Sequence, residues 1–569
     1  MTRVFDRPEE FAETAIDGLV ASHRQYLARV DGGVIRSTVT PENQVAVIIG
    51  GGSGHYPAFA GLVGPGLAAG SVCGNLFASP STSQVFRVAK AAQRGGGVLL
   101  SYGNYAGDVL HFGEAERQLN EAGIPTRTVR VTDDIASAPI EQIEKRRGIA
   151  GDLTVFKVAG AAAERGDGLD EVVRVAEKAN LHTRSLGVAF GSPTLPGAEA
   201  PLFSVPEGQF SLGLGIHGEP GISEHDMLSA QEFADLIVGK LLEDKPEAAG
   251  TRVAPILNGL GTVKYEELFV LYTHVEKLLV EAGLEIVEPE VGELVTSLDM
   301  AGLSLTLFWL DEELETLWSA PADTPAFRKG AIASRDRIDE SEIAAALVVE
   351  TVESSDAQQA AGAVASRLIE VVRATIEEHE EEFGRIDAIA GDGDHGIGMR
   401  RGAEAAAKSA RESVELGRGV EQLVQLAAEN WAEKAGGTSG ALWGAAITAV
   451  AKVLSSGEQP TTEQAAAAAR AGLKAITDLG KAEVGDKTLV DALVPFVETF
   501  EARAAVGDDV SAAFTAAATA ARDAAEATAQ LRPLKGRARP LAEKSIGHPD
   551  AGAVSLSLIV TAVAEEIAE

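Results

Sequence analysis

The spacing of apolar residues divides the chain into two parts with different predicted structures. From about residue 15 to residue 320, short apolar runs rich in β-branched residues alternate with glycine turns and with stretches of helical spacing. This alternation predicts an α/β fold with parallel or mixed sheets, long enough for two sub-domains that divide near residues 185–200. Strands are expected at 45–49, 98–100, 128–131, 186–190, 253–257 and 303–310, and helices at 82–93 and 230–242.

The pattern changes after the α/β part. Residues 319–326 are rich in proline and alanine, and the polar segment that follows predicts a linker over 331–350, between a domain at 1–330 and a second domain at 351–569. A long helix is expected to begin near Asp356, after two capping serines, and to reach His379. Alanine-rich helices without convincing strands are expected at 399–415, 419–435, 441–456, 461–479, 487–505, 510–529 and 552–567. The second domain is therefore predicted to be an all-helical bundle or barrel.

Composition and charge narrow the functional classes. The 569 residues exceed what one hydrophobic core usually organises, and 84 acidic against 49 basic residues give a net charge of −35. Such a surface repels a phosphate backbone, so no nucleic-acid partner is expected, and an anionic nucleotide must approach through a metal ion and backbone N–H groups. No apolar run reaches the roughly 18 residues of a membrane span and the N-terminus lacks a signal-peptide core, so no membrane association is expected. The single cysteine, Cys73, excludes an intramolecular disulfide and fits a cytoplasmic location.

An acidic, glycine-rich turn is predicted between the first two helices of the second domain. Asp387, Asp392 and Asp394 fall within ten residues that also hold three glycines. Carboxylates so close together repel one another unless a cation lies among them, and hard oxygen ligands suit Mg²⁺. The spacing excludes an EF-hand, because the twelfth position counted from Asp392 is Ala403 instead of an acidic residue. A solvated acidic turn is the alternative interpretation.

Two further segments of the second domain suit phosphate groups. The glycine-rich turn 436–440 leads into the helix expected at Ala441, and the unpaired N–H groups of a helix N-terminus bind phosphate. Ser439 taken alone is more simply a cap of that helix. A basic cluster at 535–539, rare in so acidic a chain, lies shortly before residues 548–552, which open the last helix. Together with the acidic turn, these segments predict a site for a nucleotide and Mg²⁺.

Three glycine-rich loops of the α/β part each carry one titratable side chain. The loop 50–57 follows a predicted strand and contains His55, but it lacks the lysine and the spacing of a P-loop. Residues 104–108 follow another strand and end in Asp108, and His217 lies between glycines with a carboxylate two residues further on. A single histidine in such a turn is more often structural than catalytic. Three such loops near the ends of strands favour a shared site.

Taken together, these motifs resemble the two-domain, ATP-dependent dihydroxyacetone kinase family, which includes erythrulose kinases, over nearly the full length of the chain. In the α/β part the motifs are GGGSGHYP at 50–57, FASP at 77–80, NYAGD at 104–108 and GIHGEPG at 215–221. In the helical part they are GDGDHG at 391–396, GGTSG at 436–440, GDKTLVD at 485–491 and GRA at 536–538. No single motif is decisive, but all of them in this order are highly specific.

The resemblance implies a mechanism for phosphorylating a small ketose with ATP. An imidazole nitrogen of His217 is implied to attack the ketone carbon and form a covalent hemiaminal. Asp108, with His55 nearby, is implied to deprotonate the terminal hydroxyl that attacks the γ-phosphate. The implied substrate-binding residues are Gly52, Ser53, Gly54, Ser79 and Gly103.

The resemblance also assigns the nucleotide site and the assembly. Asp387, Asp392 and Asp394 are implied to hold one or two Mg²⁺ ions that bridge the phosphates. The implied nucleotide-binding residues are His395, Gly396, Ile397, Gly398, Thr438, Ser439, Gly480, Leu489, Arg537, Asp550, Ala551 and Gly552. A homodimer is implied as well, with a ketose and ATP as the small-molecule partners.

Departures from the family pattern bear on the substrate. Many relatives have a lysine where this chain has Gly103, and a second histidine where it has Phe59. Loss of the lysine amine removes a substrate hydrogen bond and is expected to open space, which predicts a longer ketose such as four-carbon erythrulose beside dihydroxyacetone. Ala551 stands where proline is usual, with no expected effect on the chemistry. Three alternatives stay open: a kinase that depends on a phospho-carrier protein, an FAD-cyclising lyase, and a ketose-sensing regulatory protein.

Overall fold

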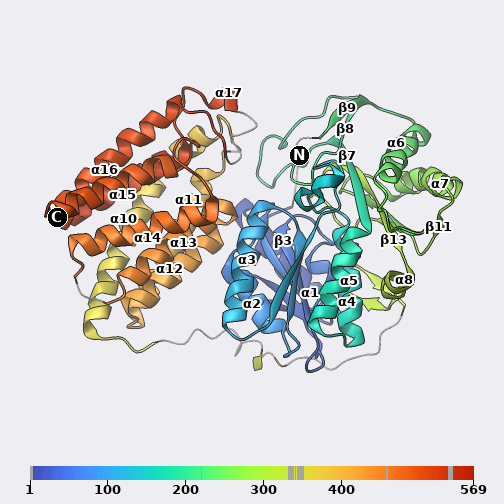
Figure 1. The fold of residues 1–569 in the computed structure, drawn as a ribbon, viewed down its shortest axis with the longest axis horizontal. Helices are drawn as coiled ribbons and strands as arrows, with labels where there is room; N and C mark the ends of the chain where they lie inside the picture. Colours follow the sequence, from blue (N-terminus) through green and yellow to red (C-terminus); the bar gives the residue numbers. More distant parts are fainter. Residues whose placement is uncertain are drawn as a thin grey trace. The chain divides into compact units, whose positions relative to one another are not determined.

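The computed structural model describes residues 4–568 apart from 220, 331–338, 340, 343–351, 392, 457–458 and 536–541. The chain forms two compact units, Met1–Val348 and Val349–Glu569 (Figure 1). The division falls inside the segment 331–350 that was expected to be a linker, most of which lies outside the described residues. The first unit is α/β and the second is helical, which confirms the predicted fold class.

The first unit begins with a six-stranded sheet in the order β1-β2-β4-β3-β5-β6. Its strands are β1 (Leu27–Val30), β2 (Gly33–Arg36), β3 (Ala46–Ser53), β4 (Gly70–Leu76), β5 (Val98–Gly103) and β6 (Thr126–Val131). Strands β4, β3, β5 and β6 are parallel neighbours, whereas β1 pairs antiparallel with β2 and β2 with β4. The carboxyl ends of β3, β5 and β6 therefore share one edge, the usual ligand-binding edge of α/β proteins.

Helices cover both faces of this sheet. They are α1 (Phe11–Ser22), α2 (Thr82–Ala92), α3 (Ala106–Glu121), α4 (Asp152–Arg165) and α5 (Leu169–Leu181). Within β3, Ala46 and Ile48 belong to the hydrophobic cluster formed with α2 and α3, whereas Val47 and Ile49 belong to the cluster formed with α4 and α5. Alternate residues thus serve opposite faces, which is why the strand is a continuous apolar run in the sequence.

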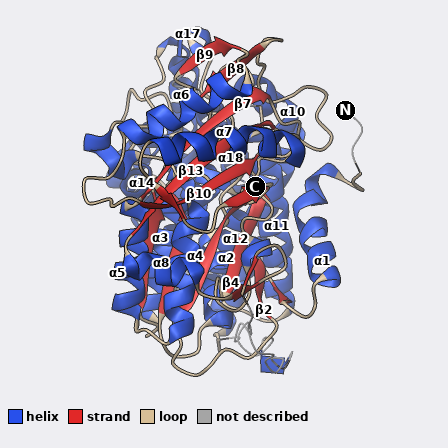
Figure 2. Ribbon diagram, turned by 90° about the vertical axis from the view of Figure 1, so that its right-hand side faces the viewer, coloured by secondary structure: helices blue, strands red, loops and turns tan. Residues whose placement is uncertain are grey.

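A second sheet follows in the order β11-β10-β13-β7-β8-β9, with β12 paired to β10 (Figure 2). Its strands are β7 (Thr183–Gly191), β8 (Gln209–Leu212), β9 (Ser223–Asp226), β10 (Arg252–Gly259), β11 (Glu285–Ile286), β12 (Glu290–Gly292) and β13 (Ala301–Leu310). The remaining elements are α6 (Ala230–Glu243), α7 (Tyr265–Glu281), α8 (Glu312–Ser319) and the hairpin β14 (Ala322–Asp323) and β15 (Arg328–Lys329). Helices α6 and α7 pack on one face, and α4 shares a hydrophobic cluster with strands of both sheets.

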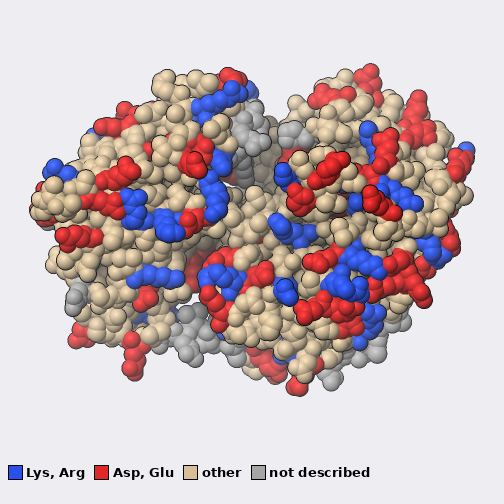
Figure 3. Space-filling view, viewed as in Figure 1, with Lys and Arg blue, Asp and Glu red and all other residues tan. Residues whose placement is uncertain are grey.

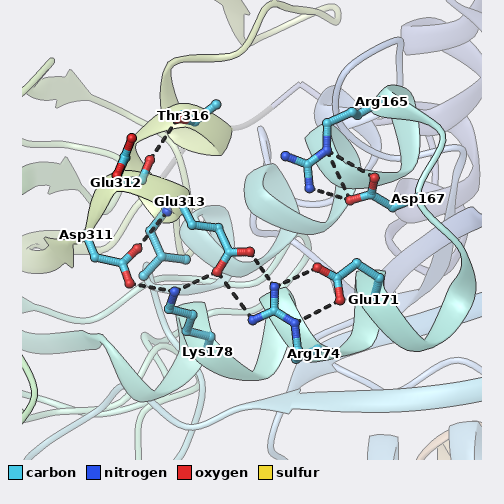
Figure 4. A network of polar contacts seen from close by, with 10 residues as sticks. Arg165, Asp167, Glu171, Arg174, Lys178, Asp311, Glu312, Glu313 and Thr316 are labelled. Carbon is cyan, nitrogen blue, oxygen red and sulfur yellow. Dashed lines mark hydrogen bonds and ion pairs between the residues drawn. The ribbon is translucent and has the colours of Figure 1, made fainter.

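Acidic and basic side chains are interspersed on the face shown in Figure 3. One ion-pair network joins α5 to the start of α8 (Figure 4). In it, Lys178 lies 2.5 Å from Asp311 and 2.6 Å from Glu313, and Arg174 pairs with Glu171 and Glu313. These side chains are partly exposed, so each pair contributes at most about 1 kcal/mol to stability.

The second unit contains no strand among its described residues. Its helices are α10 (Asp356–Asp387), α11 (His395–Glu415), α12 (Val420–Ala435), α13 (Gly437–Val453), α14 (Thr462–Gly480), α15 (Val490–Ala505), α16 (Val510–Ala527), α17 (Ala542–Ser545) and α18 (Ala551–Ala568). The predicted end of the first helix at His379 was wrong, because Phe383 is fully buried with Met399 and keeps the last turns of α10 packed. The predicted start at Ala441 was also wrong, because α13 begins at Gly437.

Helix α18 is the one helix of the described residues that is long and apolar enough to cross a membrane by length and composition. Its inner residues, including Ala553, Leu556 and Val560, belong to the hydrophobic core that α15 and α16 also form. Other residues, such as Ile559, pack with α10 and α11. These contacts are those of a core helix in a bundle, where apolar residues are needed on several faces.

Candidate functional site

Three loops of the first unit bring His55 and His217 together and place Asp108 within electrostatic range of His217. His55 follows β3, Asp108 lies in the first turn of α3 after β5, and His217 follows β8. The Nε2 atoms of the two histidines are 3.0 Å apart although the residues are 162 positions apart in the chain. Their rings meet edge to face, with centroids 4.8 Å apart and an interplanar angle of 86°.

The protonation of His55 follows from its surroundings. Its side chain is buried, and its Nδ1 lies 2.7 Å from the carbonyl oxygen of Thr296. A carbonyl oxygen only accepts hydrogen bonds, so Nδ1 carries a proton. Burial, together with the positive charge of His217, lowers the pKa of His55 to about 3, so the ring is neutral. Its Nε2 is therefore an acceptor that faces Nε2 of His217.

His217 is held on its other nitrogen by Glu219. Nδ1 lies 3.2 Å from Oε1 of Glu219, and the backbone N–H of His217 donates to Oε2 at 3.1 Å. Burial raises the pKa of Glu219, but the charges of His217 and Arg147 outweigh it and bring that pKa to about 2. The rings of Tyr105 and Phe77 lie edge to face with the imidazole, at centroid distances of 4.6 and 5.6 Å. Glu219 was not among the predicted site residues, although its spacing from His217 was visible in the sequence.

Asp108 is a buried carboxyl group with an unusual protonation equilibrium. Its side chain is 6% exposed, and its Oδ1 has no hydrogen-bond partner within the described part of the chain. Burial raises the pKa of Asp108 to about 7, although a hydrogen bond with Ser79 and the charge of His217 both act to lower it. A Cβ atom on Gly107 would lie 2.5 Å from Oγ of Ser79, so this approach needs glycine. A carboxyl group with such a pKa can exchange a proton near neutral pH.

The glycine-rich loop packs tightly against the loop that follows β4. A Cβ atom on Gly52 would lie 2.8 Å from the backbone nitrogen of Ala78, and one on Gly54 would lie 2.8 Å from Cε1 of Phe77. Ser53 donates its hydroxyl to the carbonyl of Gly74 at 2.6 Å. These glycines therefore bring the two loops close enough for His55 and Ser79 to serve the same region.

Gly103 ends β5, and its surroundings differ from the expectation that it opens space. A Cβ atom at this position would lie 3.1 Å from the carbonyl oxygen of Gly148 and 3.2 Å from Cε2 of Tyr105. The volume beside Gly103 is therefore filled by the Tyr105 ring and the Gly148 backbone.

The acidic turn of the second unit joins α10 to α11. Asp387 is the last residue of α10, and its Oδ2 is buried without a hydrogen-bond partner among the described residues. Asp394 is the N-cap residue of α11, and burial together with the charge of Asp387 raises its pKa to about 6. Asp392 lies outside the described residues. Within the described ranges, no three His, Cys, Asp or Glu side chains form a metal-binding group, yet two carboxyl groups that repel each other fit a cation.

The start of α18 lies near the same turn. Nε2 of His395 is 3.0 Å from Oγ of Ser555, which links α11 to α18. Asp550 caps α18 by accepting a hydrogen bond from the backbone N–H of Ala553 at 2.8 Å. Burial raises the pKa of Asp550 to about 7, and the charges of Asp491 and Asp387 add to that rise. The predicted nucleotide-binding residues His395 and Asp550, far apart in the chain, therefore both lie beside the first turns of α18.

Other predicted nucleotide residues occupy helix ends. Thr438 and Ser439 are exposed in the first turn of α13, whose N-cap is Gly436, so the interpretation of Ser439 as the cap was wrong. Leu489 precedes α15, and its Cβ would lie 3.3 Å from a Cβ atom on Gly552. The others are Gly396, Ile397 and Gly398 in the first turn of α11, Gly480 at the end of α14 and Ala551 at the start of α18. Arg537 lies outside the described residues.

Comparison with known proteins gives consistent matches. A Dak1 domain model matches residues 17–326 and a DAK2 domain model matches residues 389–565. The L-erythrulose kinase of Pectobacterium atrosepticum is 55% identical over 99% of this chain and 96% of its own length, and the D-erythrulose kinase of Mycolicibacterium smegmatis is 52% identical over 99% and 98%. The crystal structure of the dihydroxyacetone kinase from C. freundii in complex with AMP-PNP and Mg²⁺ superimposes with a TM-score of 0.52, at 31% identity and 99% coverage of both chains.

Proposed function

The chain belongs to the two-domain dihydroxyacetone kinase family and is an ATP-dependent ketose kinase, and we propose that it phosphorylates a terminal hydroxyl of erythrulose held covalently by His217. Full-length relatives that are more than half identical to this chain and are named erythrulose kinases support the substrate. The observation that carries the proposal is the contact of His217 with His55, beside the buried Asp108. Dihydroxyacetone is the second ketose expected to react.

The capture step uses the proton arrangement of the two histidines. Because His55 accepts at Nε2 and Glu219 accepts at Nδ1 of His217, both nitrogens of His217 carry protons before the ketose binds. Nε2 then loses its proton and its electron pair forms a bond to the carbonyl carbon. The π electron pair of the carbonyl moves to oxygen, which receives the proton by way of His55. The product is a neutral carbinol bonded to an imidazolium ring.

The phosphoryl transfer step uses Asp108. Its ionised carboxylate accepts the proton of the terminal hydroxyl while that oxygen forms a bond to the γ-phosphorus of ATP. The bond from that phosphorus to the bridging oxygen breaks, and its electron pair leaves with ADP. Glycerol has no carbonyl group and cannot be captured, so the covalent bond selects ketoses over polyols of the same size.

The second unit supplies the nucleotide site. Asp387 and Asp394, with Asp392, would hold Mg²⁺, which when bound offsets the charge of the phosphates. The N-termini of α11, α13 and α18 carry the partial positive charge of a helix start, which suits phosphate oxygens. Exposed Thr438 and Ser439 add hydroxyl donors at the start of α13. We also propose a homodimer, which light scattering of the purified protein would test.

A coupled assay of ADP release tests the function directly. With MgATP alone, turnover is expected with D- or L-erythrulose and with dihydroxyacetone, and no turnover is expected with glycerol. His217→Ala is expected to raise KM sharply or to abolish turnover. His225→Ala is the matched control, because His225 lies on β9 and hydrogen-bonds to Ser223 instead of to site residues. Normal rates in a verified His217→Ala protein would refute covalent capture.

Three further measurements separate the alternatives. If phosphorylated product forms only when phospho-carrier proteins are added, a carrier protein and not ATP is the direct phosphoryl donor. Incubation with FAD and Mn²⁺ and analysis by chromatography test for lyase activity, which would release a cyclic flavin phosphate. Binding of erythrulose without any turnover would favour a ketose sensor.

A further inference from the structure

We propose that a partly buried chain of charges, Asp134–Arg147–Glu219, positions His217 and holds the positive charge of its ring when the ketose is captured. The proposal rests on the proposed function, because it concerns how that same imidazole is made reactive. Asp134 and Arg147 touch neither the reacting nitrogen nor Asp108, so they act as positioning residues.

Glu219 fixes the orientation of the His217 ring at two points. One carboxylate oxygen binds Nδ1 of His217 at 3.2 Å and the other accepts the backbone N–H of the same residue at 3.1 Å. An ionised carboxylate only accepts, so Nδ1 must carry a proton and Nε2 must be the nitrogen that reacts. Without Glu219, the imidazole would be free to place its proton on Nε2, and the nucleophilic electron pair would then point away from the ketose.

Arg147 forms an ion pair with Glu219 and is itself anchored by Asp134. Its Nη1 lies 3.8 Å from Oε2 of Glu219, and its Nη2 lies 2.7 Å from Oδ2 of Asp134 and 3.2 Å from the carbonyl oxygen of Gly213. Its Nε donates to the same Asp134 oxygen at 2.9 Å. The Asp134 side chain is 2% exposed and that of Arg147 is 15% exposed, so solvent screens these charges little.

The backbone leaves room for this chain at one glycine. A Cβ atom on Gly215 would lie 2.0 Å from Oε2 of Glu219 and 2.6 Å from Nη1 of Arg147. Any larger residue would therefore displace both side chains. The gap at Gly215 is what allows Arg147, from the loop before α4, to approach the carboxylate beside His217.

The charge arrangement matches the needs of the capture step. After the C–N bond forms, the ring keeps its positive charge and its Nδ1–H, which still points at Glu219. The groups that face His217 are Glu219 from its own loop, His55 after β3, and Asp108 and Tyr105 at the start of α3. Of these, Glu219 is the charged group that hydrogen-bonds to the ring, so it contributes most to stabilising the cation.

A neighbouring pair provides a matched control. Arg146 donates to both carboxylate oxygens of Asp244, at 2.8 and 2.6 Å, and its side chain is fully buried. This pair is about as buried as the Asp134–Arg147 pair and involves the adjacent arginine, yet within the described part of the chain neither Arg146 nor Asp244 forms a hydrogen bond or ion pair with His217. A purely structural role would make Asp134→Asn and Asp244→Asn behave alike.

The test compares Glu219→Gln, Asp134→Asn and Asp244→Asn in the full-length protein. We expect KM for the ketose to rise about tenfold or more in Glu219→Gln and about threefold or more in Asp134→Asn, with KM for MgATP unchanged in both. We expect Asp244→Asn to keep the wild-type KM for both substrates. NMR of ketose labelled with ¹³C at the carbonyl carbon should show less of the tetrahedral carbon signal in the first two variants.

Equal ketose KM and equal tetrahedral signal in wild type, Glu219→Gln and Asp134→Asn would overturn the proposal, as would equal losses in Asp134→Asn and Asp244→Asn. If Glu219→Gln or Asp134→Asn fails to fold, Gly215→Ala and Arg147→Lys perturb the same charges and are compared with Asp244→Asn instead. Thermal melting is the check on folding. Absence of a tetrahedral signal in wild type would refute covalent capture itself. Absence of turnover in wild type would refute the kinase function, and so the failures can be told apart.

Discussion

Replacement of Asp108 by asparagine should lower the catalytic rate and, above neutral pH, raise the stability of the protein. Asparagine keeps the shape of the side chain and can keep the hydrogen bond with Ser79, but it cannot accept a proton from the substrate hydroxyl. General base catalysis contributes about 10²–10⁴-fold to a rate. We therefore expect kcat with erythrulose to fall by that factor, which corresponds to about 3–5 kcal/mol in the barrier.

Stability should move the other way above neutral pH. The pKa of Asp108 is raised from 3.8 to about 7 by burial, so the folded state holds an extra proton across this range. The free energy of unfolding of the wild type therefore falls as pH rises from about 4 to about 7, and the deficit persists above that. Asparagine has no such charge, so the variant should be more stable at pH 8 by up to about 4 kcal/mol and equal to wild type near pH 4.

The assay pairs steady-state kinetics with calorimetry at several pH values. In wild type, kcat/KM should rise with pH through about 7, as Asp108 ionises. Capture of ¹³C-labelled ketose should persist in Asp108→Asn, because formation of the C–N bond uses the histidines. A variant that keeps the wild-type kcat, or one that is less stable than wild type at pH 8 while folded at pH 4, would refute the reasoning.

Four further predictions concern other parts of the chain. Asp387→Asn should weaken Mg²⁺-dependent ATP binding by at least about tenfold in calorimetry, whereas Asp478→Asn, exposed on α14, should not; equal affinities would remove Asp387 from the metal site. Gly160→Ala should destabilise the first unit by about 1–3 kcal/mol in urea, because its Cβ atom would lie 2.2 Å from the carbonyl oxygen of Leu67. Gly113→Ala, with open space around it in the described structure, should instead stabilise α3 by about 0.5–1 kcal/mol, and a loss there would contradict this packing. Lys487→Met should cost the second unit about 1–3 kcal/mol, since the Lys487 ammonium donates to the carbonyls of Leu531 and Ser545, and an unchanged urea midpoint would show those bonds to be unimportant.

Much of the secondary structure was predictable because its signals are local. The apolar run at 45–49 identified β3, and the glycines after it identified the loop that carries His55. Helix α4 could not be found in this way, because nearly every residue from Leu153 to Ala163 is buried and no polar face marks a helical period. The end of α10 was missed because it depends on the burial of Phe383 by residues from other helices.

The sequence by itself determined the division into an α/β part and a helical part and the positions of the glycine-rich loops, and it identified His55, Asp108 and His217 as candidate site residues. Only the tertiary structure decided that Nε2 of His55 meets Nε2 of His217, and that Arg147 reaches Glu219 through the gap at Gly215. It also decided that burial lowers the pKa of His55 to about 3 and raises that of Asp108 to about 7. The physical reason is that desolvation and Coulomb interactions depend on neighbours in space, which a list of residues does not contain.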